Sequence, residues 1–399
     1  MTKTTIAKRL DGVSESATLK LNALVQAMRA RGEDIVNLTA GEPDFAPPEE
    51  AKAAVRRALD ENRNKYTPVG GLPEIRERVA KKTNVQQPNV VAMHGEWKAS
   101  DVVVTNGGKQ ALYNVMMALL NPGDEVLIPA PYWLSYPEMV KLAEGKPVVV
   151  ETRAENKFKA TVDDLKKKLT PKTKILILNS PSNPTGTTYT RAEFEAIGAW
   201  IAKEAPNLWV ISDEIYDRIL FGADPFVSFL DAAPGLKNRA VTVNGLSKSA
   251  AMTGWRIGWT LAPPELTQAL LTLQGQSTSG INSLAQYAGI AALDLAEEKF
   301  AEMTAAFKRR RRMALEILAK AAKLKVVPPE GAFYVFLGIG AFLKAGEDSM
   351  NLSETLIREA KVAVVPGTPF GAPEWVRMSI ATDDETLKKG CERLVEFFG

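Results

Sequence analysis

Histidine and cysteine are almost absent from this chain of 399 residues, and each scarcity excludes a kind of chemistry. His94, the only histidine, would have to serve in any histidine-based hydrolase triad, and no nucleophile-elbow sequence accompanies it. Zinc sites built from several histidines or cysteines lack ligands, so we expect no metal site. Cys391, the only cysteine, cannot form an internal disulfide, which favours a reducing compartment and predicts a cytoplasmic protein.

Long apolar runs and a large charge of one sign are missing as well. No run of roughly 18 apolar residues occurs, so we expect no transmembrane helix. The polar and basic start at 1–10 lacks the apolar centre of a signal peptide. With 50 basic and 47 acidic residues the net charge is +3, which predicts no strong affinity for nucleic acid or for anionic membranes.

What is present is the composition of an ordinary globular protein, with 45% hydrophobic and 24% charged residues. Through much of the chain, short apolar runs alternate with helical patterns. Near-continuously apolar strands separated by helices indicate a parallel sheet buried on both faces, and ligands collect at the carboxyl ends of such strands. The runs that we predict to be strands of this sheet are 102–105, 126–129, 175–178, 208–212 and 240–243.

The length of the chain predicts one large domain and a smaller one. A helical pattern without proline over 283–323 should connect the two, and the strand-like runs 362–366 and 376–380 should belong to the smaller domain. We expect an N-terminal arm and helix over 1–45 that pack with the small domain, a large domain over 46–290 and a small C-terminal domain over 291–399.

The most informative stretch follows the strand-like run 240–243. There the amine of Lys248 could form a Schiff base with a cofactor, while the hydroxyl of Ser247 and the guanidinium of Arg256 hold a phosphate. Taken alone, the stretch fits a surface lysine in a turn about as well as a cofactor site. The residues at the ends of the other predicted strands distinguish the two interpretations.

Asp213, Asn183 and Tyr216 could serve the ring of pyridoxal phosphate, which needs an acid near its nitrogen and donors to its phenolate oxygen. Asp213 follows a buried strand, where an unpaired carboxylate is costly and a pyridinium would stabilise it. A helix N-cap is the rival interpretation. Asn183 and Tyr216 can both bond the phenolate oxygen, although Asn183 also suits a turn before Pro184.

A phosphate cradle, a ring platform and a carboxylate receptor have candidates too. The turn 106–110 contains Gly107 and Gly108 and opens a helix, so its backbone amides can hold phosphate oxygens. Trp133 could stack on the pyridine ring, though a tryptophan there is more often part of a core. Arg377 lies within an apolar strand, where a buried arginine demands an anion and its planar fork matches a carboxylate.

These segments, in this order, resemble the fold-type I, pyridoxal-phosphate-dependent class I aminotransferases, and most closely their bacterial aspartate aminotransferase branch. The resemblance covers the chain from Val13 to Phe398. It implies an α/β protein with the aspartate aminotransferase-like fold. In that fold a large domain binds the cofactor and has a mainly parallel sheet between helices, and a smaller domain is α+β. The segments that carry the resemblance are 38–45, 65–71, 105–112, 131–136, 179–186, 212–216, 244–259 and 375–381.

The resemblance implies a role for each candidate residue. Lys248 would form the Schiff base and move the proton, and Asp213 would pair with the pyridine nitrogen. Tyr216 would bond the phenolate oxygen together with Asn183, and with Lys248 and Asp213 it makes up the catalytic set. The phosphate would be bound by Gly107, Gly108, Ser247 and Arg256, and the substrate α-carboxylate by Arg377, Asn183 and the backbone of Gly41, with Lys109 and Trp133 beside both cofactor and substrate.

The resemblance also implies a partner and a reaction. A tyrosine in the position of Tyr66 reaches the phosphate of the neighbouring subunit in this family, and a composite site of this kind implies an obligate homodimer. The implied reaction is ping-pong transamination between L-aspartate, or a related amino acid, and 2-oxoglutarate. An aromatic or prephenate aminotransferase of the same family is the alternative, followed by a pyridoxal-phosphate-dependent β-lyase. A dehydrogenase is disfavoured because no Gly-x-Gly-x-x-Gly motif follows the first strand.

Substrate choice centres on Lys109, beside the phosphate turn. Similar aspartate-specific bacterial enzymes use this lysine for the distal carboxylate, and a flexible point charge there would favour aspartate and glutamate. Other members of the superfamily place an arginine around 274–278, where this chain has none. The rival interpretation is that Lys109 supports the phosphate or faces solvent.

Two features depart from the family pattern. Tyr136 stands where some relatives carry the histidine that supports the ring aspartate, so we expect Tyr136 or a water molecule to orient Asp213. The segment 84–97 looks longer than in the simplest relatives. We interpret it as a surface insertion, and His94 within it as non-catalytic.

Overall fold

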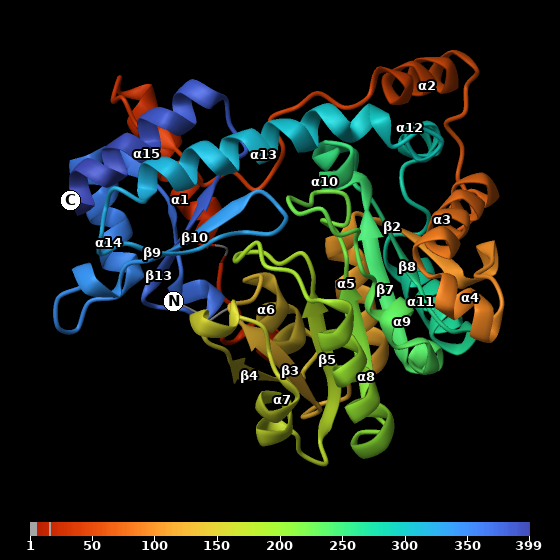
Figure 1. Cartoon of the computed structure of the whole chain (residues 1–399). Coiled ribbons are helices and arrows are strands. Elements are labelled where there is room, and N and C mark those ends of the chain that lie inside the picture. Colours follow the sequence, from red (N-terminus) through yellow and green to blue (C-terminus); the bar gives the residue numbers. More distant parts are fainter. Residues whose placement is uncertain (1–5, 16) are drawn as a thin grey trace.

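A seven-stranded sheet forms the centre of the larger part of the molecule in the computed structural model, which describes residues 6–15 and 17–399 (Figure 1). Its strands lie in the order β2 (Val102–Asn106), β8 (Ile257–Leu261), β7 (Ala240–Gly245), β6 (Trp209–Asp213), β5 (Thr173–Asn179), β3 (Glu125–Ala130) and β4 (Lys146–Glu151). β8 runs antiparallel to both of its neighbours, and the remaining pairs are parallel. The prediction of a mainly parallel sheet is confirmed.

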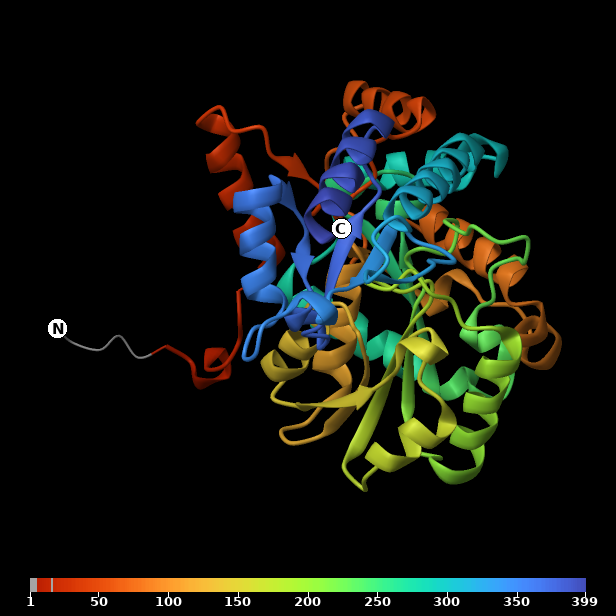
Figure 2. The ribbon, with the colours of Figure 1, turned by 60° about the vertical axis from the view of Figure 1, so that its left-hand side comes forward.

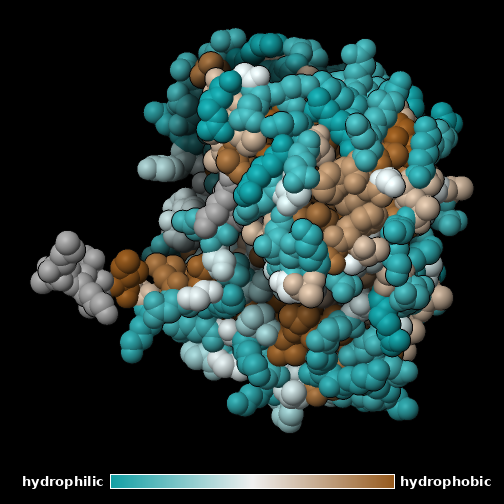
Figure 3. Space-filling view, turned by 90° about the vertical axis from the view of Figure 1, so that its left-hand side faces the viewer, coloured by the Kyte–Doolittle hydropathy of each residue, from teal (hydrophilic) through white to brown (hydrophobic). Residues whose placement is uncertain are grey.

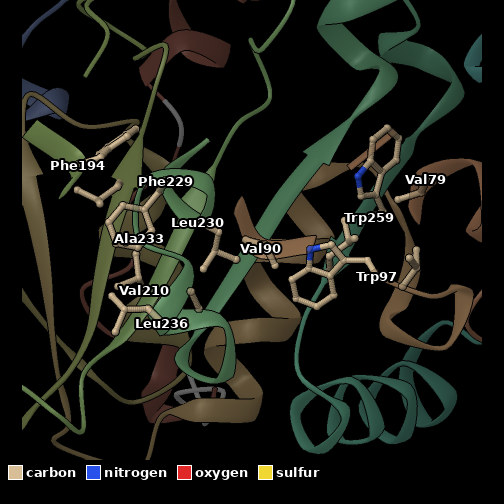
Figure 4. Packing of buried hydrophobic residues seen from close by; sticks show 14 of the residues in the cluster. Val79, Val90, Trp97, Phe194, Val210, Phe229, Leu230, Ala233, Leu236 and Trp259 are labelled. Atoms are coloured by element: carbon tan, nitrogen blue, oxygen red, sulfur yellow. The ribbon is translucent and has the colours of Figure 1, made fainter. Parts of the chain in front are cut away.

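Helices cover both faces of this sheet. Successive residues of each strand point to opposite faces, so the apolar side chains of one strand are buried under helices on both sides. In β5, Ile175 and Ile177 pack on one side, and Leu176 and Leu178 pack on the other. The first side is covered by α5 (Gly108–Leu119), α6 (Ser135–Leu142) and α11 (Pro264–Ser277). The second side is covered by α3 (Pro73–Gln86), α8 (Arg191–Glu204), α9 (Phe229–Ala232) and α12 (Ser283–Leu293), and Figure 4 shows part of this packing.

The smaller part of the molecule is built on an antiparallel sheet with its own core. The strand order is β12 (Val365–Pro366), β13 (Trp375–Ser379), β10 (Tyr334–Gly338) and β9 (Lys325–Val327). Phe307, Val335 and Leu394 belong to one buried cluster of this part. Its helices are α13 (Glu298–Leu318), α14 (Ser349–Thr355) and α15 (Asp384–Phe398), and α13 and α15 lie side by side (Figure 1).

The N-terminal segment joins the smaller part. α1 (Ala17–Ala30) leads to β1 (Val36–Asn37), which pairs in parallel with β11 (Val362–Ala363). Val25 of α1 packs against Ile357, and Figure 2 shows α1, in red, along the side of the smaller part. The division of the chain at residues 45 and 290 stays a prediction, and its first range includes residues outside those that the structure describes.

The single long helix predicted over 283–323 is wrong. The chain forms α12 and α13 with a break at 294–297. Asp294 ends α12, and its carboxylate accepts hydrogen bonds from Nε of Arg78 at 2.7 and 2.8 Å. The break has a physical reason, since α12 packs into the core of the larger part, whereas α13 from Met303 onward packs into the core of the smaller part.

The segment 84–97, which we interpreted as a surface insertion, is not confined to the surface, and its being an insertion stays a prediction. The segment forms α4 (Pro88–His94), and Val90 and Trp97 are buried in the core of the larger part (Figure 4). His94 itself is exposed. Because the segment contributes an aliphatic and an indole side chain to the core, it is part of the folded body rather than a loop that the fold merely tolerates.

Three helices complete the larger part, namely α2 (Glu49–Asp60), α7 (Val162–Lys168) and α10 (Leu246–Ser249). No helix within the described ranges has both the length and the apolar character that crossing a bilayer would need. Those ranges also contain no group of three histidine, cysteine or acidic side chains placed to hold a metal ion.

Candidate active site

A cavity of about 300 Å³ lies at the carboxyl ends of β3, β5, β6 and β7, next to β10 and β13 of the smaller part. This is the edge at which parallel sheets bind ligands. Asp213 is the one acidic residue among the described residues that line the cavity. Gly107 and Tyr66 do not line it, whereas the other predicted site residues do: Gly41, Gly108, Lys109, Trp133, Asn183, Asp213, Tyr216, Ser247, Lys248, Arg256 and Arg377.

Lys248 presents a buried amine to this cavity. It lies in α10, directly after β7, and its Nζ donates to the carbonyl oxygen of Gly41 at 2.5 Å. Burial lowers the pKa of the amine to about 8, Glu42 opposes the fall, and Arg377 adds to it. A larger fraction of Lys248 than of an ordinary lysine is therefore uncharged near neutral pH, and the uncharged amine is the form that attacks a carbonyl carbon.

Asp213 ends β6 and is buried at the floor of the cavity. The hydroxyl of Tyr136 donates to Oδ2 of Asp213 at 2.6 Å, and the backbone N–H of Ile215 donates to Oδ1 at 3.3 Å. Of the two means of orienting Asp213 that the sequence left open, the structure supplies Tyr136. Burial raises the pKa of Asp213 to about 6, against the effect of both hydrogen bonds. The carboxylate thus lacks a cation that would stabilise its charged form.

Two donors face the middle of the cavity from the loops after β5 and β6. The backbone N–H of Asn183 donates to Oδ1 of Asn179 at 2.9 Å, which fixes the loop. The hydroxyl of Tyr216 lies 3.1 Å from that of Tyr334, and both side chains are buried. The sequence did not single out Tyr334, because an aromatic residue at the start of an apolar strand cannot be told from a core residue by pattern alone.

Gly107 lies against the side chain of Arg256, which lines the cavity, but does not line the cavity itself. Its φ is +84°, and a Cβ added there would lie 2.6 Å from Nη2 of Arg256, so a side chain would clash with the guanidinium. Arg256 donates to the carbonyl oxygens of Asn106 and Thr253, at 3.1 Å in each case. Because α5 begins at Gly108, its unpaired backbone amides and this guanidinium point to one anion site.

Lys109 follows Gly108 and lies over an aromatic ring. Its Nζ is 5.0 Å from the centre of the Trp133 ring. Burial lowers the pKa of Lys109, and the neighbouring Arg256 lowers it further. Lys109 lines the cavity together with Trp133 and Arg256, although the residue as a whole is exposed in the single chain.

Arg377 lies in β13 and is buried on the side of the smaller part. Its Nη1 donates to Oδ1 of Asn183 at 2.9 Å, and its Nη2 donates to the carbonyl oxygen of Thr39 at 3.1 Å. Its guanidinium lies 4.3 and 5.2 Å from the ring centres of Tyr334 and Phe370. Within the described ranges, Nε has no hydrogen-bond partner. A buried guanidinium held only by neutral groups still calls for an anion.

Pyridoxal phosphate fits these residues. The buried carboxylate of Asp213 needs a positive partner, which a protonated pyridine nitrogen would supply. The amine of Lys248 is buried and partly uncharged, as Schiff-base chemistry requires. The space over Gly107 would be filled by any side chain, and the amides of α5 and the guanidinium of Arg256 are suited to a phosphate.

Comparison with known proteins gives one consistent result. Residues 33–394 match the family model for aminotransferase class I and II. The aspartate aminotransferase of Geobacillus stearothermophilus is 42% identical over 394 residues, which cover 98% of each chain. The probable aspartate/prephenate aminotransferase of Aquifex aeolicus is 41% identical, over 98% of this chain and 97% of that one. Among solved structures, aspartate aminotransferase from Thermus thermophilus with maleate superposes with a TM-score of 0.91 at 40% identity, covering 98% of this chain and 99% of that one.

Proposed function

The chain belongs to the class I and II aminotransferases, and on that premise we propose that it transfers the amino group of L-aspartate to 2-oxoglutarate. Enzymes of this family depend on pyridoxal 5′-phosphate, which is therefore its cofactor. Full-length relatives named aspartate aminotransferase support aspartate as the donor. The observation that carries the proposal is the presence of Arg377 and Lys109 in one cavity, where two cationic groups can meet the two carboxylates of the substrate.

When bound at Lys248, pyridoxal phosphate would supply an electron sink for the α-carbon of the substrate, and its α-hydrogen would become acidic. Lys248 can take that proton on Nζ, because its lowered pKa leaves part of the amine uncharged. Asp213, held by Tyr136, keeps the pyridine nitrogen protonated. We assign the α-carboxylate to Arg377, whose fork is already aimed through its contact with Asn183.

The distal carboxylate of the substrate is assigned to Lys109. Its amine lies over the Trp133 ring, and Asp213 is the one acidic residue of the cavity lining among the described residues. A lysine is a point charge on a flexible stem, so it can follow substrates of different length. This flexibility favours a second candidate, prephenate, which relatives named aspartate/prephenate aminotransferase also suggest.

Product analysis tests the proposed function. Purified protein supplied with L-aspartate and 2-oxoglutarate should form oxaloacetate and glutamate in equal amounts. The second candidate is tested by supplying glutamate as the amino donor and prephenate as the acceptor. Release of ammonia, pyruvate and hydrogen sulfide from L-cysteine, an amino acid with a leaving group on its β-carbon, without formation of glutamate would instead identify a β-lyase. Failure to form glutamate from any amino acid would overturn the proposal.

The homodimer is a further part of the proposal, and it draws on Tyr66, whose side chain is fully exposed. The hydroxyl of the next residue, Thr67, accepts from Nε2 of Gln286 at 2.9 Å. The segment before Gln286, 278–285, lines an open cavity of about 640 Å³ that also contains Arg256. In a two-fold dimer the same face meets itself, so Tyr66 of one copy could enter this cavity in the other and reach the phosphate.

Exposed apolar surface bears on the expected homodimer. Figure 3 shows brown patches on one side of the molecule, including the arm before α1, where Ile6 and Leu10 are exposed. Contiguous apolar surface of this kind is typical of contacts between proteins, which supports a second copy as partner.

Cys391 is free and buried, and we propose a reducing, cytoplasmic location.

A further inference from the structure

Two tyrosine hydroxyls meet inside the cavity. Tyr216 follows β6 of the larger part, Tyr334 begins β10 of the smaller part, and their oxygens are 3.1 Å apart. Both side chains are buried, and within the described ranges neither hydroxyl has another hydrogen-bond partner. Either oxygen can be the donor in such a pair, and the choice decides where the second proton points.

We propose that Tyr334 donates to Tyr216 and thereby turns the proton of Tyr216 toward the phenolate oxygen of the cofactor. Tyr334 is then a positioning residue, because it acts on the cofactor only through Tyr216. This inference rests on the proposed function, in which Tyr216 bonds that oxygen. It adds to the site a residue that neither the sequence pattern nor the contacts of the cofactor ring would single out.

The charge of Arg377 favours this direction of donation. Its guanidinium lies 4.3 Å from the ring centre of Tyr334. Burial raises the pKa of Tyr334, and Arg377 works against this rise. Burial also raises the pKa of Tyr216, with Tyr334 and Asp213 adding to the effect and Arg377 opposing it. The guanidinium of Arg377 lies over the ring of Tyr334, and a cation at this distance makes the hydroxyl of that phenol a better hydrogen-bond donor.

The backbone before Tyr334 holds its hydroxyl in place. The N–H of Gly331 donates to the carbonyl oxygen of Gly186 at 2.8 Å, and the N–H of Ala332 donates to that of Ile219 at 2.9 Å. Both acceptors belong to the larger part, although Tyr334 opens a strand of the smaller part. The segment is thus fastened to the same body as Tyr216, which keeps the two oxygens at a fixed separation, as a preorganised site requires.

Tyr334→Phe tests the inference, because it removes the hydroxyl and keeps the ring that contacts Arg377. The bound cofactor is coloured, and the pH at which its colour changes depends on how strongly its phenolate oxygen is hydrogen-bonded. A donor to that oxygen stabilises the deprotonated form. Weaker donation by Tyr216 should therefore raise the pH of the colour change in Tyr334→Phe, by about half a unit. If Tyr216 instead donated to Tyr334, Tyr334→Phe should lower the pH of the colour change, since the freed proton of Tyr216 would turn to the cofactor.

Two further variants make the result specific. Tyr189→Phe is the matched control, because Tyr189 is also buried and its hydroxyl accepts from the N–H of Ala160 at 2.9 Å, outside the cavity lining. It should leave the colour change where it is. In a Tyr216→Phe background, Tyr334→Phe should produce no additional shift.

An unchanged or lowered pH of colour change in Tyr334→Phe would overturn the inference, and so would a full shift in the Tyr216→Phe background. A wild-type protein that takes up no pyridoxal phosphate would overturn the proposed function instead. The two failures are therefore distinguishable.

Discussion

Single residues in the cavity carry charges without their usual partners. Asp213 and Arg377 are buried and Lys248 is half-buried, and within the described ranges none of them bonds a side chain of opposite charge. A buried charge is costly unless something neutralises it. Cofactor and substrate are the missing counter-ions in our account, with the pyridinium opposite Asp213 and the α-carboxylate opposite Arg377.

Lys109→Ala tests the assignment of the distal carboxylate. Loss of a charge-assisted contact should lower kcat/KM for aspartate by about 10- to 100-fold, and should change it little for a neutral amino acid such as alanine. Steady-state kinetics with both donors measure the difference. Lys237→Ala is the matched control, since Lys237 also lies over an indole, that of Trp97 at 4.3 Å, but outside the cavity lining. Equal losses for both donors would remove Lys109 from substrate recognition.

Gly107→Ala tests the phosphate cradle. The added Cβ would lie 2.6 Å from Nη2 of Arg256 at a φ of +84°, so we expect the affinity for pyridoxal phosphate to fall about 10-fold or more. Gly123 offers a matched control, since its φ is +86° and a Cβ there meets nothing within 4 Å. Gly123→Ala should cost about 1 kcal/mol of stability and leave cofactor affinity unchanged. Titration of both variants with pyridoxal phosphate measures the two affinities. Equal affinities of Gly107→Ala and Gly123→Ala would contradict a phosphate cradle at Gly107.

What the sequence could predict at this scale follows from chemistry. Lys248 and Arg377 stand out because an amine among small residues and an arginine in an apolar strand need a ligand to explain them. Tyr334 and Trp97 do not stand out, since an aromatic residue in an apolar context fits a core equally well. Their hydrogen bonds depend on residues far away in the chain, and only the folded structure brings them together.

At the scale of elements, the strands that the sequence predicted are those buried on both faces. Both β2 and β4 lie at an edge of the sheet, and β4 was missed because it is the less buried of the two, with exposed ends at Lys146 and Glu151. β8 was missed because Gly258 interrupts its apolar pattern. That glycine is required by the tertiary structure, since a Cβ there would lie 2.4 Å from the backbone nitrogen of Gly108. Edge position and close backbone approach are properties of the sheet, and the segment alone does not reveal them.

The segment 84–97 is tied to β6 by a buried chain of hydrogen bonds. The indole of Trp97 donates to Oε1 of Gln87 at 2.8 Å, and Nε2 of Gln87 donates to the hydroxyl of Ser228 at 2.9 Å. That hydroxyl and the hydroxyl of Ser212 both donate to Oε1 of Glu214, at 2.7 and 2.8 Å. Glu214 directly follows Asp213 in the chain, so the segment helps to fix the backbone at Asp213.

Glu214→Gln tests the electrostatics of this chain of hydrogen bonds. Burial raises the pKa of Glu214 from 4.5 to about 7, against the effect of the two serine hydroxyls. The contribution of Glu214 to stability is therefore present below about pH 4.5 and is lost as pH rises through about 7, since the unfolded chain releases the proton first. The loss should amount to about 3 kcal/mol at most.

Denaturant unfolding of wild type and Glu214→Gln, at one cofactor concentration between pH 4 and pH 8, measures this contribution. We expect the fall in unfolding free energy across that window to be smaller in the variant. Parallel curves for the two proteins would show that Glu214 does not hold its proton more tightly in the folded state.

At the scale of the whole molecule, mixing of two inactive variants tests the composite site. Lys248→Ala lacks the amine, and Tyr66→Phe should bind the cofactor less tightly, so each alone should be impaired at limiting pyridoxal phosphate. In a mixed dimer, one site would combine an intact Lys248 with an intact Tyr66 from the other copy. Unfolding and refolding the two together should restore about a quarter of the sites. No gain over the separate proteins would place Tyr66 outside the partner's site.

The overall architecture could be predicted from the sequence, whereas the relation of its parts could not. The alternation of apolar strands and helices predicts the mainly parallel sheet, and ligands at its carboxyl edge follow from that topology. The break between α12 and α13 escaped prediction because nothing in the local pattern over 283–323 indicates that the two halves enter different cores. Only long-range packing decides where one long helical pattern is divided.

The most direct test of the central claim is a half-reaction with purified protein. Addition of L-aspartate without any oxo acid should bleach the yellow cofactor and form oxaloacetate in an amount equal to the bound pyridoxal phosphate, and 2-oxoglutarate should then restore the colour. Lys248→Ala should show neither change within the same time. A protein that binds the cofactor but neither bleaches nor forms oxaloacetate with aspartate would contradict the account.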